Sequence, residues 1–140
     1  MTDKVNFHFE IDGDSFTSAG EASVKIKKLL RGMSFTPDVI RRVSVAMYEG
    51  EINMVIHANG GTADVDVYCD RIEIILADRG PGISDIDLAM QEGYSTAPDN
   101  IRSLGFGAGM GLPNMKRYTD EMKIESEVGK GTTVYMTVKV

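Results

Sequence analysis

The stretch DRGPGI at residues 78–83 follows an apolar run, IEIILA at 72–77, and ends it abruptly. Asp78 stops the run, and two glycines then bracket Pro81. A turn of type I or II with proline at its corner is one interpretation. A nucleotide pocket is the other. A carboxylate at the end of a strand can accept a hydrogen bond from an exocyclic amino group, and glycines let the backbone approach a flat ring closely.

Upstream of this stretch, the sequence predicts one strand and two helices. Residues 4–11 alternate between apolar and polar side chains, which is typical of a half-buried strand. Apolar residues at helical spacing predict a helix over residues 18–31 and a second one from Pro37 to about Ala58. Thr36 is placed to cap the second helix, since its side-chain oxygen can accept a free N–H of the first turn.

The remaining chain predicts a sheet with one more helix. Alternation at residues 64–69 puts Cys69 on the same side as Val65 and Val67, so it is expected in the core. Further predicted elements are a buried strand at 71–77, an apolar-periodic piece at 86–90, a helix at 109–119 and a closing hairpin that turns at 128–130. The order β-α-α-β-β-(loop)-α-β-β favours an α+β two-layer sandwich, with helices on one face of a mixed, mostly antiparallel sheet.

Composition restricts the class of protein. The 140 residues fit one domain, expected to span residues 1–140, and 42% apolar content suffices for a core. A net charge of −6, without a cluster of lysine and arginine, argues against direct nucleic-acid binding. Cys69 is the single cysteine, which excludes an internal disulfide and suits a reducing compartment. No signal-peptide run and no stretch near the ~18 apolar residues of a membrane span occurs, so a cytoplasmic location is expected.

The second helix carries a polar stripe. In EGEINMVIHA, Glu49, Asn53 and His57 are spaced four residues apart and fall within a stripe of about 80°. A solvated face would explain such a stripe without any function. A functional interpretation needs the stripe to face other motifs, because buried polar groups are costly without partners.

A glycine-rich run precedes the third helix. LGFGAGMGL at 104–112 has Gly105, Gly107, Gly109 and Gly111 on alternate residues, and it opens a helix whose free N–H groups can receive phosphate. A flexible glycine loop is the alternative. The run matches neither the dinucleotide fingerprint nor the P-loop pattern, so neither of those nucleotide-binding folds is indicated.

Taken together, the stripe, DRGPGI, the glycine run and GKGTTV at 129–134 resemble, in order and spacing, the four motifs of the GHKL ATP-binding fold (HATPase_c, or Bergerat fold). Gyrase-type topoisomerases, Hsp90-type chaperones, histidine kinases and MutL-type repair proteins share this fold. The resemblance covers about residues 35–138. It implies that Asp78 reads the amino group of adenine, and that Gly80 and Gly82 make room for the base.

Two longer stretches, residues 78–96 and 104–122, look like small bacterial anti-sigma factors and switch serine/threonine protein kinases. The resemblance implies that Glu49 is the catalytic general base and that Asn53 holds Mg²⁺ against the phosphates of ATP. It assigns a supporting role at the adenine site to Thr132 or, less favoured, Thr133. The residues implied to bind the nucleotide are Asn53, Asp78, Gly80, Gly82, Ile83, Gly105, Gly107, Gly109, Met110, Gly111, Leu112 and Thr132.

A lid over the nucleotide is expected at about residues 92–108. It looks longer than the lid of the switch kinases that the sequence resembles most, because APDNIRS is added. Arg102 in the addition is interpreted as solvated, with an approach to the γ-phosphate as the alternative. His57 is interpreted as a support for Asn53 or a helix cap.

Three functions fit these motifs. The first is a kinase that phosphorylates a small STAS-domain protein in a partner-switching pathway. The second is a nucleotide-gated anti-sigma factor that sequesters a sigma factor. The third, a detached histidine-kinase catalytic domain, is disfavoured because the chain has no dimerisation helix pair with a phospho-acceptor histidine. The ATP site cannot distinguish the first two functions, because both use it.

Neither of these two functions requires nucleic acid or a membrane as a direct partner. The oligomeric state stays open, and a homodimer is one possibility.

Overall fold

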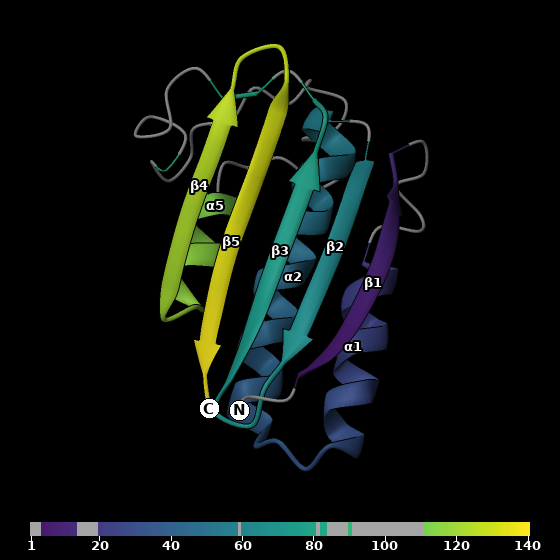
Figure 1. Ribbon diagram of the computed structural model, residues 1–140, viewed down its shortest axis with the longest axis vertical. Helices are drawn as coiled ribbons and strands as arrows, with labels where there is room; N and C mark the ends of the chain where they lie inside the picture. Colours follow the sequence, from purple (N-terminus) through teal and green to yellow (C-terminus); the bar gives the residue numbers. More distant parts are fainter. Residues whose placement is uncertain (1–3, 14–19, 59, 81, 84–89, 91–110) are drawn as a thin grey trace.

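The computed structural model describes residues 4–13, 20–58, 60–80, 82–83, 90 and 111–140. In these ranges, five strands form one sheet, and three helices cover one of its faces (Figure 1). In chain order, the elements are β1 (Val5–Asp12), α1 (Glu21–Gly32), α2 (Pro37–Ala58), β2 (Gly60–Val67), β3 (Arg71–Asp78), α5 (Gly111–Arg117), β4 (Glu121–Glu127) and β5 (Gly131–Lys139). The α+β two-layer class expected from the sequence is confirmed.

Helix α2 begins where its sequence indicates. Pro37 is its first residue, and the backbone N–H of Val39 donates to Thr36 Oγ1 at 3.3 Å, so the threonine caps the helix. The helix is 22 residues long and ends at Ala58, just before the glycines that open β2. Because α2 is the longest helix among the described residues, it can reach from one end of the sheet to the other (Figure 1).

The expectation of a mixed sheet was wrong. The strand order is β1-β2-β3-β5-β4, and all four neighbouring pairs are antiparallel. Two helices separate β1 from β2, so the chain returns to the end of the sheet where β1 finished and β2 runs back beside it. Strand β4 has the same direction as β3, but β5 inserts between these two strands. Every neighbour is therefore antiparallel.

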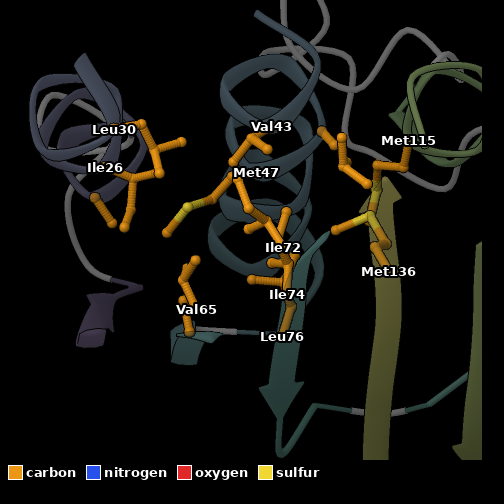
Figure 2. Packing of buried hydrophobic residues seen from close by; sticks show 14 of the residues in the cluster. Ile26, Leu30, Val43, Met47, Val65, Ile72, Ile74, Leu76, Met115 and Met136 are labelled. Atoms are coloured by element: carbon orange, nitrogen blue, oxygen red, sulfur yellow. The ribbon is translucent and has the colours of Figure 1, made fainter. Parts of the chain in front are cut away.

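The hydrophobic core lies between the sheet and the helices. Figure 2 shows Ile26 of α1 and Met47 of α2 above Val65 of β2 and Ile74 of β3, with Met136 of β5 farther along the sheet. All five side chains are fully or almost fully buried. The core methionines Met47 and Met136 are therefore part of the apolar packing, where their flexible side chains can adapt to neighbours of different shape.

Helix α1 is attached to α2 through a buried carboxylate. Glu51 is only 1% exposed, and its two oxygens accept backbone N–H groups of Gly20 at 2.9 Å, Ala22 at 3.3 Å and Ser23 at 2.7 Å. These N–H groups belong to the uncapped first turn of α1, where a negative charge is favourable. Burial raises the pKa of the Glu51 carboxyl, and the backbone hydrogen bonds oppose that shift. Sequence reasoning did not single out this residue.

Some predicted boundaries and positions differ from the structure. Cys69 was expected in the core but is exposed, because β2 ends at Val67 and the residues after it turn toward β3. The helix predicted at 109–119 spans Gly111–Arg117 among the described residues. The buried strand at 71–77 is confirmed, although only alternate residues are fully buried. The predicted piece at 86–90 lies outside the described residues except for Met90.

None of the helices in the described ranges combines the length and the apolar content needed to cross a bilayer.

Candidate functional site

The helix-covered face of the sheet changes from apolar to polar at one end. Register pairs Leu76 of β3 with Val134 of β5, and Val134 with Ile124 of β4, to form an apolar row. The next row toward the end of the sheet consists of Asp78, Thr132 and Ser126, and we call it the polar row. Ser126 and Thr132 are register partners, and Thr132 contacts Asp78 directly. The core therefore stops where three hydrogen-bonding side chains lie next to one another.

Asp78 is anchored through one of its two carboxylate oxygens. Its Oδ1 accepts the N–H of Gly80 at 2.9 Å and the N–H of Thr132 at 3.0 Å. Within the described part of the chain, Oδ2 accepts no hydrogen bond. The first bond closes a tight turn over Asp78–Gly80, and the second joins DRGPGI to GKGTTV. The predicted turn with Pro81 at its corner lies outside the described residues. Asp78 thus presents at the edge of the core a carboxylate oxygen, Oδ2, to which none of the described residues donates.

Ser126 joins the same two motifs from a third strand. Its Oγ accepts the N–H of Ile83 at 2.7 Å, lies 2.8 Å from Thr132 Oγ1 and donates to the carbonyl of Gly131 at 3.2 Å. Sequence reasoning missed Ser126. The alternation of Met122, Ile124 and Ser126 on the core side of β4 was the signal that could have found it.

Gly82 is required for the close approach of the DRGPGI segment to the β4–β5 hairpin. Its φ of 80° lies in the left-handed region, and a Cβ at this position would be 2.5 Å from the carbonyl oxygen of Glu127. A side chain here would push the segment off the hairpin. It would thereby disturb the bond from Ile83 to Ser126.

Helix α2 runs toward the end of the sheet where β3 ends and β5 begins, the top in Figure 1, and Glu49 and Asn53 belong to its second half. Gly50 lets the helix lie close to the sheet, because a Cβ at this position would overlap Cδ1 of Leu76. Leu76 belongs to the row next to the polar row. The stripe on α2 is therefore not a freely solvated face: both Glu49 and Asn53 are half-buried. The side chain of His57 lies outside what the structure describes.

Helix α5 packs against Glu49 and Asn53 of the stripe. Asn114 Nδ2 donates to Glu49 Oε1 at 3.4 Å, and Asn53 Nδ2 lies 3.9 Å from the sulfur of Met115. Gly111 touches the Asn53 amide, since a Cβ there would lie 2.8 Å from its Oδ1. Burial raises the pKa of the Glu49 carboxyl above its ordinary value, and the bond from Asn114 partly offsets the shift. A carboxylate of raised pKa beside a hydrogen-bonding amide is suited to accept a proton.

The structure brings most of the described candidates together. Glu49, Asn53 and Gly111 meet at the α2–α5 contact, whereas Asp78, Gly80, Gly82, Ile83 and Thr132 meet at the polar row. Leu112 is half-buried and packs on the core. Thr132, 8% exposed, lies on the core side of β5, whereas its neighbour Thr133 pairs with Ala77 on the other face. Gly105, Gly107, Gly109, Met110, Arg102 and the expected lid lie outside the described residues.

The fold, and the meeting of described residues from all four motifs at the α2–α5 contact and at the polar row, are those of a nucleotide-binding domain of the GHKL kind. The family model "Histidine kinase-, DNA gyrase B-, and HSP90-like ATPase" matches residues 38–140. The chain belongs to this family, and membership implies that it binds ATP.

The chain is similar in sequence to proteins of two kinds, anti-sigma factors and a protein kinase. The chain is 30% identical to an anti-sigma F factor of Priestia megaterium, over 97% of this chain and 92% of the relative. It is 35% identical to the serine/threonine-protein kinase RsbT of Bacillus subtilis (strain 168), over 66% of this chain and 67% of the relative. The resemblance to anti-sigma factors and switch kinases is therefore confirmed.

Two solved structures share the fold. One contains the RsbU and RsbW domains of Rv1364c from Mycobacterium tuberculosis, with a TM-score of 0.65 and 17% identity. The match covers 96% of this chain but 32% of that longer chain. The other is the SiaB–SiaC complex from Pseudomonas aeruginosa, with a TM-score of 0.59, 14% identity, and coverage of 96% of this chain and 89% of the matched one.

Proposed function

We propose that this protein is an ATP-dependent serine/threonine protein kinase that acts on a small STAS-domain protein in a bacterial partner-switching pathway, in the cytoplasm. The observation that carries the proposal is Glu49: a half-buried carboxylate of raised pKa, one helical turn from Asn53. A relative named as a serine/threonine-protein kinase supports the same activity.

The residues have separate tasks in this proposal. Asp78 accepts a hydrogen bond from the 6-amino group of adenine through Oδ2, the oxygen that its two backbone bonds leave free. Gly80, Gly82 and the glycine-rich run up to Gly111 let the backbone lie close to the base and phosphates. As the hydroxyl oxygen of the substrate attacks the γ-phosphorus, Glu49 accepts its proton, and the bond to the β-phosphate oxygen breaks to release ADP.

Asn53 fits a magnesium ion. Its Nδ2 is directed to the sulfur of Met115, and its Oδ1 accepts no hydrogen bond from the described residues. An amide carbonyl is a hard oxygen ligand, and Mg²⁺ in nucleotide sites takes one or two protein ligands, with phosphate and water supplying the others. A bound ion at Asn53 would neutralise phosphate charge, while Asn53 itself only holds and orients it.

The proposal is tested by measuring phosphate transfer from γ-labelled ATP to a purified STAS-domain protein whose gene lies next to the gene of this protein. We expect Mg²⁺-dependent labelling of a serine or threonine by the wild type. A protein that binds ATP but labels no candidate substrate would contradict the kinase function.

A nucleotide-gated anti-sigma factor is the second candidate. The observation that favours it is the alignment with an anti-sigma F factor over nearly the whole of both chains, whereas the named kinase aligns over two thirds. Co-purification with a sigma factor in the presence of ATP, without transfer to any STAS-domain protein, would select this function instead.

A further inference from the structure

We propose that Ser126 is a positioning residue that makes the site selective for a 6-amino purine, by fixing the direction of the Thr132 hydroxyl. This inference rests on the proposed binding of adenine at Asp78. It goes beyond that binding because it assigns the rejection of 6-oxo purines to a residue of a third strand.

The hydroxyl of Ser126 already makes two hydrogen bonds besides its contact with Thr132. A serine hydroxyl has one hydrogen to donate and two lone pairs that can accept. One lone pair of Ser126 accepts the N–H of Ile83, and its hydrogen reaches the carbonyl of Gly131. Ser126 Oγ therefore has one lone pair left to accept a hydrogen bond, and this oxygen lies 2.8 Å from Thr132 Oγ1.

The hydrogen between the two hydroxyls can come from Thr132 or from Ser126. If Thr132 donates to Ser126, and Ser126 donates to Gly131, all three bonds of Ser126 form together. If Ser126 donated to Thr132 instead, its bond to the carbonyl of Gly131 would be lost. A chain of bonds that point in one direction also polarises its members favourably. The arrangement that makes more bonds therefore has Thr132 as the donor.

The direction of this bond decides what Thr132 can offer to a ligand. With its only hydrogen used, the Thr132 oxygen has acceptor capacity alone. Asp78 Oδ2, on the adjacent strand and the same face, also only accepts. Two acceptors favour an amino group, which donates, and repel a carbonyl oxygen, which does not. Without Ser126, the Thr132 hydroxyl is free to rotate and to donate to a carbonyl.

ATP and ITP test this directly, because they differ only at position 6 and the adjoining ring nitrogen. We expect the wild type to bind ATP more tightly than ITP, by titration calorimetry with Mg²⁺. In Ser126→Ala, the ratio of the ITP to the ATP dissociation constant should fall roughly three- to tenfold, the change that corresponds to about one hydrogen bond. Most of the fall should come from tighter ITP binding.

Controls separate selectivity from stability. Ser126→Thr keeps the hydroxyl and should restore the wild-type ratio, whereas Thr133→Ala, on the opposite face, should leave it unchanged. If Ser126→Ala does not fold, Ser126→Cys replaces it, because a thiol keeps the shape but is a weak acceptor, and the same fall is expected.

An unchanged ratio in Ser126→Ala or Ser126→Cys, or equal weakening of both nucleotides, would overturn the role of Ser126 while leaving adenine binding at Asp78 intact. A wild type that binds ITP as tightly as ATP would instead remove the base-reading role of Asp78, and the inference about Ser126 with it.

Discussion

At the scale of single residues, Glu49 and Asn53 share one stripe of α2 but are given different tasks. Glu49 handles a proton in the transition state, so Glu49→Gln should leave the affinity for ATP nearly unchanged and slow phosphate transfer by about 10²–10⁴-fold. Transfer assays and nucleotide titration on the same preparations measure both quantities. Transfer at the wild-type rate by Glu49→Gln would exclude this residue as the general base.

The environment of Glu49 predicts a pH dependence. Its pKa is raised by burial, and the carboxyl can accept a proton only when ionised, so kcat/KM should rise with pH through that raised pKa and then level off. Asn114 donates to Glu49 and favours the charged form. Asn114→Ala should therefore move the rising limb to higher pH. A limb that stays in place, or moves to lower pH, would contradict this pairing.

Asp78 allows a test of base recognition. In Asp78→Asn, Oδ1 can still accept the N–H groups of Gly80 and Thr132, but the free oxygen becomes an NH₂ donor. The affinity for ATP should fall roughly 10- to 100-fold, the loss of one hydrogen bond to a charged group. Asp64→Asn, on the other face of the sheet, is the matched control and should retain wild-type affinity in calorimetry.

At the scale of elements, the closeness of α2 to the sheet depends on Gly50. A methyl group there would overlap Leu76, so Gly50→Ala should lower the free energy of unfolding by about 1–3 kcal/mol, in spite of the better helix propensity of alanine. Gly32→Ala, at the end of α1, is the control. No atom lies within 4 Å of its added methyl, and stability should stay level or rise. Urea unfolding of both variants measures the difference.

The attachment of α1 to α2 depends on the charge of Glu51. Glu51→Gln keeps the size of the side chain but replaces one accepting oxygen by a donor, against three backbone N–H groups. We expect a loss of roughly 2 kcal/mol in unfolding free energy. Glu21→Gln removes an exposed charge from the same first turn and should cost only a few tenths of a kcal/mol. Equal losses of unfolding free energy in the two variants would indicate that any negative charge near the start of α1 has this effect, and would contradict a specific role for the buried hydrogen bonds of Glu51.

At the scale of the whole molecule, the site joins parts that are far apart in sequence, so the nucleotide should stabilise the entire fold. At an ATP concentration 100 times its dissociation constant, linkage adds about 2.7 kcal/mol, which raises Tm by roughly 10 °C for a chain of this size. Thermal unfolding with ATP, in Mg²⁺ or in EDTA, measures this. In the proposed site, EDTA or Asn53→Ala should remove most of the increase, and a full increase in EDTA would contradict the metal role of Asn53.

The sequence by itself determined those features that depend on neighbours along the chain. The cap at Thr36, the start at Pro37 and the end near Ala58 follow from local hydrogen bonding and from the fixed φ of proline. The apolar run at 72–77 likewise identified β3 as a strand with a buried side, and Asp78 was singled out because it ends that run just before a glycine-rich stretch. These are all properties of a few consecutive residues.

Only the tertiary structure decided which residues meet across elements. Nothing local requires β5 to lie between β3 and β4, yet that insertion makes the sheet antiparallel and puts Ser126 beside Thr132 and Asp78. Cys69 was misplaced because alternation does not tell where a strand stops. Glu51 escaped notice since its partners are backbone N–H groups some thirty residues away, which have no sequence signature. Contacts between distant segments are set by how the layers pack, and packing depends on the whole chain at once.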